Sequence, residues 1–236
     1  MKPIDKMKNL SFIALFLIST ACSTDSIEEN TSIAQNTAKK TNLSGVTVSN
    51  SLNPFDNVGE SYLLLLDNYD VFHPKPSNSI DAKEVLETIG TGMGILNASY
   101  IPESLQSINA VQQLSIDDLS LAISQSGLST QAQGMLLNCI SGLLLLKEQD
   151  AAYDEAYAFL IAFESQVISS NLSAEEKQIL LSTLSIVRYD IYNGSARKGK
   201  DRDWELSVGN FVSTAYGAKQ SSSNAIINAG ISNILH

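Results

Sequence analysis

Three residues near the end of the first expected helix have side chains that can bind a metal ion. Asp67, Asp70 and His73 lie three residues apart, and oxygen and imidazole ligands at that spacing share one face of a helix. His73 directly precedes Pro74, and the residue before a proline is pushed out of the helical conformation. We therefore interpret the three as solvated polar residues at a helix end, and we predict no metal site.

A glycine-rich stretch, Gly90-Thr91-Gly92-Met93-Gly94, has the backbone freedom to surround a phosphate group. Phosphate-binding loops follow a strand, and the Walker type also needs Gly-Lys-Ser/Thr. Neither feature is present. The stretch is interpreted as a connector or as a helix weakened by glycine, so no nucleotide or other cofactor is predicted.

Paired carboxylates are the remaining candidates for catalysis, but each pair has a structural explanation. They fall in the first turns of expected helices, where they complement the positive end of the helix dipole: Asp117-Asp118, Asp154-Glu155 and Glu175-Glu176. The basic cluster Arg197–Arg202 is diluted by acidic neighbours and is interpreted as a solvated loop, the alternative being contact with lipid headgroups or an anionic glycan. We predict no enzyme; the alternative is a hydrolase whose residues meet only in the fold.

Two cysteines remain, and they differ in surroundings. Cys139 lies in a strongly apolar helical stretch and is expected to be a buried, inert thiol. Three lysines (Lys2, Lys6 and Lys8) and the apolar run Leu10–Ile18 precede Cys22. Small residues, 19–21, separate this run from the cysteine. A basic start, an apolar middle and a small-residue end make up an export signal. At 1.5 Å per residue the run covers roughly 14 Å, too little to span a bilayer core.

This leader resembles the signal of a bacterial lipoprotein, in which the cysteine is acylated and becomes the first mature residue. Ala21 and Thr20 fit that pattern, whereas Ser19 stands where it usually has Leu, Val or Ile. The resemblance implies fatty acyl groups such as palmitate on Cys22, a membrane partner reached through that lipid, and a location at the outer membrane. The alternative is an ordinary signal peptide cut near Ala21.

The segment after Cys22 turns polar and acidic at once. Its residues Asp25, Glu28 and Glu29 are similar to an acidic signal that moves some lipoproteins to the outer face of the outer membrane. A solvated acidic tether is the alternative. About half of residues 23–53 are Ser, Thr or Asn, which is typical of a flexible chain. We therefore predict a signal peptide over 1–21, a lipidated tether over 22–53 and one domain over 54–236.

The charge of the chain limits its partners. The formal net charge is −10, and removal of residues 1–21 makes it more negative because three lysines and one aspartate are lost. Nucleic acid is therefore not an expected partner, since binding it needs a basic face. Another envelope protein or a glycan remains open.

Helix signals recur throughout the domain. Expected starts include Asp56, Ser79, Pro102, Ser115, Ser129, Asp150 and Ser173, the last with Glu176 in a capping box; expected ends are Gly127 and Gly194. No long alternating pattern indicates a strand. These signals predict an all-α fold, a compact bundle of about seven or eight helices. The apolar run Leu143–Leu146 is expected on a central helix buried nearly all round.

Small residues recur every four positions in the last segment. They are Gly209, Ser213, Gly217, Ser221, Ala225 and Ala229. In a continuous helix they would form one ridge that lets another helix approach closely. The ridge predicts tight packing against a helix of the same domain, with a break into a hairpin at Ser221–Asn224 as one arrangement. The alternative is membrane insertion or self-association into a homo-oligomer.

These observations predict an outer-membrane lipoprotein whose helical domain acts by binding or by structural association. The location is predicted from the leader. Binding is favoured over catalysis because the sequence shows no catalytic constellation.

Overall fold

The fold is all-α. The computed structural model describes residues 47–72, 75–112, 118–197 and 205–235, and all of them belong to one compact unit. Within these ranges there is no strand. The helices are α1 Asp56–Phe72, α2 Ser79–Gly92, α3 Leu105–Gln112, α4 Leu119–Ser124, α5 Thr130–Glu148, α6 Tyr153–Ser169, α7 Ala174–Ile191, α8 Glu205–Ala218 and α9 Ser222–Leu235. A short π-helix, Tyr192–Arg197, continues α7.

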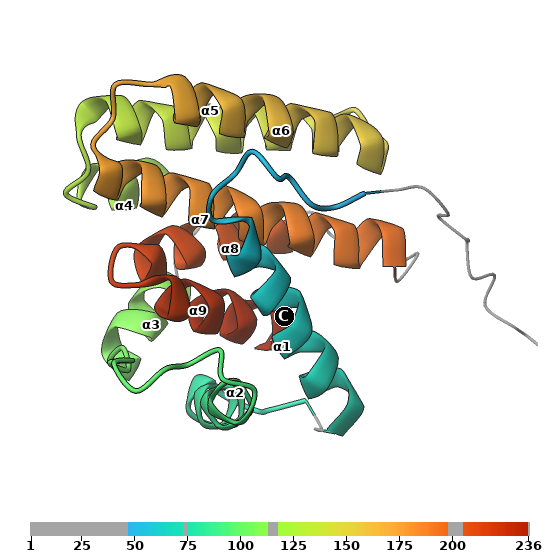
Figure 1. The fold of residues 1–236 in the computed structure, drawn as a ribbon, viewed down its shortest axis with the longest axis vertical. Coiled ribbons are helices and arrows are strands. Elements are labelled where there is room, and N and C mark those ends of the chain that lie inside the picture. The colour runs from blue at the N-terminus through green and yellow to red at the C-terminus, as the bar shows by residue number, and fades with distance from the viewer. Residues whose placement is uncertain (1–46, 73–74, 113–117, 198–204, 236) are drawn as a thin grey trace, which may run out of the picture. The chain divides into compact units, whose positions relative to one another are not determined.

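Helix α7 is the centre of the described domain. It contacts α1, α5, α6, α8 and α9, and every residue from Ile179 to Ile191 is buried. Helices α5 and α6 cover one side of α7, and α1, α8 and α9 cover another (Figure 1). Helix α2 packs on α1 and α9. The buried apolar side chains of all these helices join in one core.

The position of the central helix corrects an expectation from the sequence. Leu143 of α5 is buried, but Leu145, in the same apolar run, is 53% exposed. Helix α5 is thus an outer helix, whereas α7 is buried although it contains Ser182, Thr183 and Arg188. Burial of these polar side chains is tolerated because hydrogen bonds and ion pairs satisfy most of them.

Several helix starts are those that the sequence predicts. The Ser129 hydroxyl accepts a hydrogen bond from the Ala132 N–H at 3.3 Å. Ser173 and Glu176 form the expected capping box at the start of α7. Gly127 has φ 76°, which explains why the chain turns there.

Three predicted boundaries are wrong. Pro102 is not the first residue of a helix, because α3 begins at Leu105. Asp150 does not cap α6: it has φ 51°, and α6 begins after Ala152, whose N–H donates to the Glu155 carboxylate at 3.0 Å. Gly194 does not end α7, because the chain continues through it as a π-helix. In all three places the local residue types fit a boundary, and packing shifts it by a few residues.

The folded domain also starts earlier than the predicted boundary at residue 54. Residues 47–53, which we call the strap, lie against α6 and α7. Asn50 and Asn53 are buried, and both donate to the Glu164 carboxylate. The predicted tether therefore does not extend to Asn53, since its last residues belong to the core.

Candidate functional site

An apolar pocket opens between α3, α4, α5 and α8. Its volume is about 350 Å³, which lies within the usual range for small-molecule sites. Phe211, Leu136 and Ile179 line it and are almost fully buried. They come from α8, α5 and α7, so the core of the domain supplies the floor.

Two large apolar side chains stand at the opening of the pocket. Leu121 of α4 is 58% exposed and Tyr216 of α8 is 39% exposed, and both line the opening. Most exposed large apolar side chains need no special explanation. Two of them beside an apolar cavity extend its apolar lining to the solvent. An apolar molecule would remove both from water on binding.

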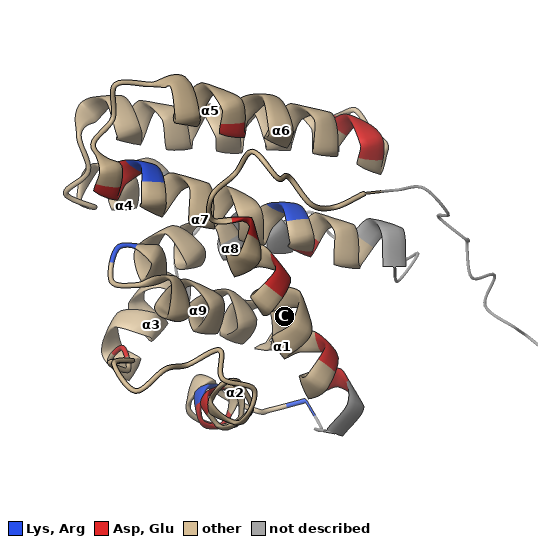
Figure 2. Ribbon diagram, viewed as in Figure 1, with Lys and Arg blue, Asp and Glu red and all other residues tan. Residues whose placement is uncertain are grey.

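The charged residues among the described lining are both exposed. Asp118 and Lys219 are the charged residues that line it. Lys219 follows α8, and its Nζ donates to the Ser126 carbonyl. Figure 2 shows the basic residue in the connection between α8 and α9. The chain turns directly after Ser126, because Gly127 has a positive φ. The pocket can thus hold an apolar body whose polar end stays near the edge.

A second feature of the domain is a buried ionic cluster around Arg188. The guanidinium pairs with Glu164 at 3.2 Å and with Asp56. It also donates to the Val48 carbonyl of the strap. Burial raises the pKa of Glu164, and the charge of Arg188 with the amides of Asn50 and Asn53 opposes the rise. The cluster thus connects the strap, α1, α6 and α7.

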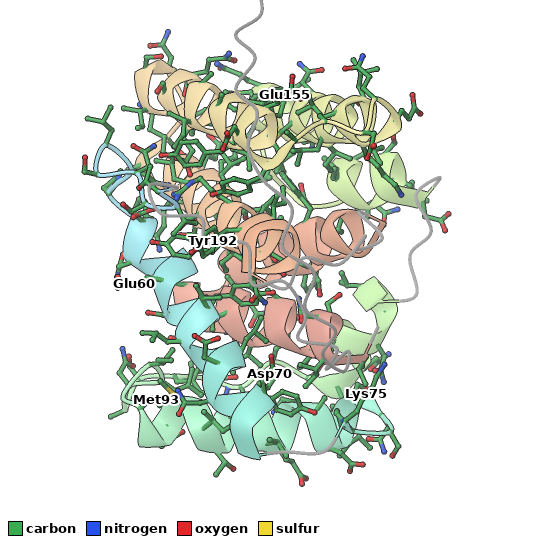
Figure 3. All side chains as sticks on the ribbon, turned by 90° about the vertical axis from the view of Figure 1, so that its right-hand side faces the viewer. Glu60, Asp70, Lys75, Met93, Glu155 and Tyr192 are labelled. Carbon is green, nitrogen blue, oxygen red and sulfur yellow. The ribbon has the colours of Figure 1, made fainter. Side chains whose placement is uncertain are left out.

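Two tyrosines of α6 also bind the strap. Tyr153 and Tyr157 donate to the carbonyls of Thr47 and Ser49 at 3.3 and 3.1 Å. Tyr192 packs edge-on against Tyr153, with ring centroids 5.7 Å apart. Figure 3 shows Tyr192 between α1 and the layer of α5 and α6. Arg188, Glu164, Tyr153 and Tyr157 all hydrogen-bond to the strap, so we assign the cluster to structure rather than to ligand binding.

The small-residue ridge lies where α8 meets α9. The segment is a helical hairpin, because α8 ends at Ala218 and α9 begins at Ser222. A Cβ on Gly217 would lie 2.5 Å from the Asn224 carbonyl oxygen, and Ala225 and Ala229 are fully buried. Ser213 donates to the Asn228 carbonyl at 3.5 Å. Ser221 caps α9 by accepting from the Asn224 N–H. Gly209 lies in the first half of α8, where side chains fall outside the described residues.

The other candidate residues are placed as follows. Cys22 and His73 lie outside the described residues, as do Lys198–Arg202. Among the residues that the structure describes, no cluster of three or more His, Cys, Asp or Glu could hold a metal ion. Gly90 is buried in α2, and Gly94 has φ 72° just beyond its end. Burial raises the pKa of the Cys139 thiol, which disfavours the reactive thiolate.

None of the helices searched in the described ranges is both long and apolar enough to cross a membrane. Comparison of the chain with protein-family models, with curated proteins and with solved structures found no match.

Sequence reasoning did not find the pocket. Its lining comes from five helices between Ser107 and Lys219, and no local spacing connects them. The pocket's most telling residues are Leu121 and Tyr216, which are large, apolar and exposed. Their exposure follows from the fold, so the sequence alone could not reveal it.

Proposed function

We propose that this protein is an outer-membrane lipoprotein whose helical domain binds an apolar small molecule. The leader supports the anchor: lysines, a short apolar run and small residues precede Cys22. The polar, acidic segment that follows suits a chain that holds a domain away from a membrane. Acyl groups on Cys22 would supply the attachment, at about 0.8 kcal/mol per buried methylene.

The pocket is the observation that carries the binding function. It combines an apolar floor, exposed apolar residues at the rim and, among its described lining residues, charged groups that are exposed. Such a cavity, with few polar groups, is typical of sites for apolar ligands. Among the described lining residues Asp118 is the one carboxylate, and a glycoside hydrolase needs a facing pair.

A fluorescence titration tests the binding function. The probe is N-phenyl-1-naphthylamine, a neutral apolar dye that becomes bright in an apolar cavity. We expect saturable binding to the full chain, and displacement by a medium-chain fatty alcohol. Ala215→Leu places extra carbon in the pocket, since Ala215 lines it, and should weaken binding at least tenfold.

The matched control is Ala158→Leu, which adds the same atoms at an exposed position of α6. It should leave dye binding unchanged. Equal binding by the wild-type protein and both variants would contradict the assignment of the pocket, as would the absence of saturable binding.

The anchor is tested separately. Cells fed a labelled fatty acid should incorporate it into the wild-type protein but not into Cys22→Ser, and the wild-type protein should fractionate with outer membranes. Protease treatment of intact cells then shows on which face the domain lies. A mature protein that begins at Met1 or has an unmodified Cys22 thiol would contradict the anchor and leave the pocket result untouched.

Self-association through the ridge is not favoured by the structure. Gly217, Ala225 and Ala229 are buried within the α8–α9 contact, so they do not form a free surface in the described domain.

A further inference from the structure

Three buried oxygen atoms without a hydrogen-bond partner belong to residues of α9 and of the segment before α3, which are in contact (Figure 1). They are Glu103 Oε1, Asn224 Oδ1 and Asn228 Oδ1. The side chains are 5%, 3% and 1% exposed. Asn224 and Asn228 are one turn apart on α9, so they point to the same side of that helix. An unpartnered buried acceptor destabilises the fold, and more so when it is charged.

Existing contacts bring the three residues together. Asn228 Nδ2 donates to Glu103 Oε2 at 2.7 Å. Asn224 Nδ2 donates to the Ile101 carbonyl at 3.2 Å and to Gln220 Oε1 at 3.3 Å. The Gln220 side chain also lies close enough to Glu103 to lower the pKa of its carboxyl. The amide donors are thereby used, and the cluster keeps a surplus of acceptors.

Within the described residues, no cation is recorded in contact with this surplus of acceptors. The groups that stabilise the ionised form of Glu103 are the amides of Asn228 and Gln220, which are neutral, while burial raises its pKa. Arg188, the buried cation of the described domain, pairs with Asp56 and Glu164 instead. A water molecule could donate to two of the three oxygens, but it would not neutralise an ionised Glu103. A proton on Glu103 would turn one of the three oxygens into a donor for a second and leave the third unpaired.

We propose that Glu103, Asn224 and Asn228 bind a calcium ion through these three oxygen atoms. Carboxylate and amide oxygens are the ligands that hard cations prefer, and Ca²⁺ accepts irregular geometry better than Mg²⁺ does. The site lies close to solvent, since Ile101 is 76% exposed and Gln220 is exposed as well. Water molecules complete the coordination from that side.

A site with one carboxylate binds weakly. Affinity for Ca²⁺ rises with the number of charged ligands, and sites of low charge have dissociation constants of about 0.1–1 mM. The ion would join α9 to the segment before α3 and would thereby stabilise the packing of this segment on the α8–α9 hairpin. This inference is independent of the pocket and of the anchor.

Thermal unfolding of the chelator-treated full chain tests the calcium site. CaCl₂ is added up to about 10 mM at constant ionic strength, with NaCl and MgCl₂ in parallel. Calcium at about ten times the dissociation constant should raise the midpoint by about 3 °C, and equilibrium dialysis should find one bound ion. Glu103→Gln keeps the shape, removes the charge and should weaken binding at least tenfold.

Two further variants locate the ion. Glu148→Gln removes an exposed carboxylate on α5 and should leave calcium binding unchanged. Asn224→Ala removes one neutral ligand and should also weaken binding, which keeps the test valid if Glu103→Gln fails to fold.

Three results would overturn the proposal: no calcium binding by the wild-type protein, binding that neither Glu103→Gln nor Asn224→Ala weakens, or an equal effect of sodium or magnesium. A midpoint that rises as the pH falls toward the ordinary pKa of Glu, without a response to calcium, would show that a proton neutralises Glu103 instead.

Discussion

Glu176 connects the starts of two helices. One carboxylate oxygen accepts from the Ser129 N–H at 2.8 Å, and the other accepts from the Ser173 N–H at 3.1 Å. Ser129 precedes α5 and Ser173 precedes α7. Each serine is recognisable as a cap in the sequence, but the shared carboxylate is not, because α5 and α7 start far apart in the chain.

The shared carboxylate predicts a dependence of stability on pH. Hydrogen bonds from the Ser129 hydroxyl and N–H lower the pKa of Glu176 to about 2, from an ordinary value of 4.5. The stabilisation is thus complete above pH 4.5 and is lost as the pH falls toward 2. Glu176→Gln should lower the free energy of unfolding at neutral pH by about 1 kcal/mol.

Urea unfolding of both proteins at several pH values measures this effect. The difference between wild type and Glu176→Gln should shrink as the solution is acidified. Glu175→Gln, on the exposed neighbour, serves as control and should show no such trend. A difference that stays constant with pH would mean that Glu176 contributes by shape and not by charge.

At the scale of elements, glycine sets how closely helices approach. A Cβ on Gly217 would lie 2.5 Å from the Asn224 oxygen and 2.8 Å from the Ala225 Cα. These are backbone atoms of α9, which cannot rotate away as a side chain would. Gly217→Ala must therefore separate α8 from α9, and we expect a loss of about 1–3 kcal/mol in the free energy of unfolding.

Gly134 provides the opposite case. It lies within α5, and nothing stands within 4 Å of the position that its Cβ would occupy. Gly134→Ala should stabilise the protein by up to about 1 kcal/mol, because alanine favours the helix. Thermal or urea unfolding of the two variants measures both effects, and a Gly217→Ala protein as stable as wild type would contradict close contact in the hairpin.

Helix type and several boundaries could be predicted from the sequence because they depend on neighbouring residues. Ser129 and Ser173 cap helices as local patterns require. The central helix could not be found in this way. The Leu143–Leu146 run has more apolar character, but α7 is buried because partners far away in the chain, such as Asp56 and Glu164, satisfy Arg188. The pocket and the Glu103 cluster are likewise products of distant contacts.

At the scale of the whole domain, the strap is part of the fold. Asn50 and Asn53 supply two amide donors to Glu164, one of them at 2.9 Å. A shortened chain that begins at Pro54 loses both and leaves that carboxylate with fewer partners. Hydrogen bonds to a charged group contribute about 1.5–3 kcal/mol each.

A chain that begins at Pro54 should therefore be less stable than one that begins at Thr47, by about 3 kcal/mol. Urea unfolding of the two shortened chains measures the difference, and Asn53→Ala in the full chain should give part of it. Equal stability would show that the strap lies on the surface of the domain without supporting it.

The strap also determines how the domain responds to a mechanical load. Tension applied to the chain upstream of Thr47 reaches the core through the Val48 carbonyl, Asn50 and Asn53, which are held by Arg188 and Glu164. These bonds resist together, because they end on two neighbouring helices of the core. A protein pulled from its amino terminus should thus yield in one abrupt step, at the Arg188 cluster, rather than peel open helix by helix.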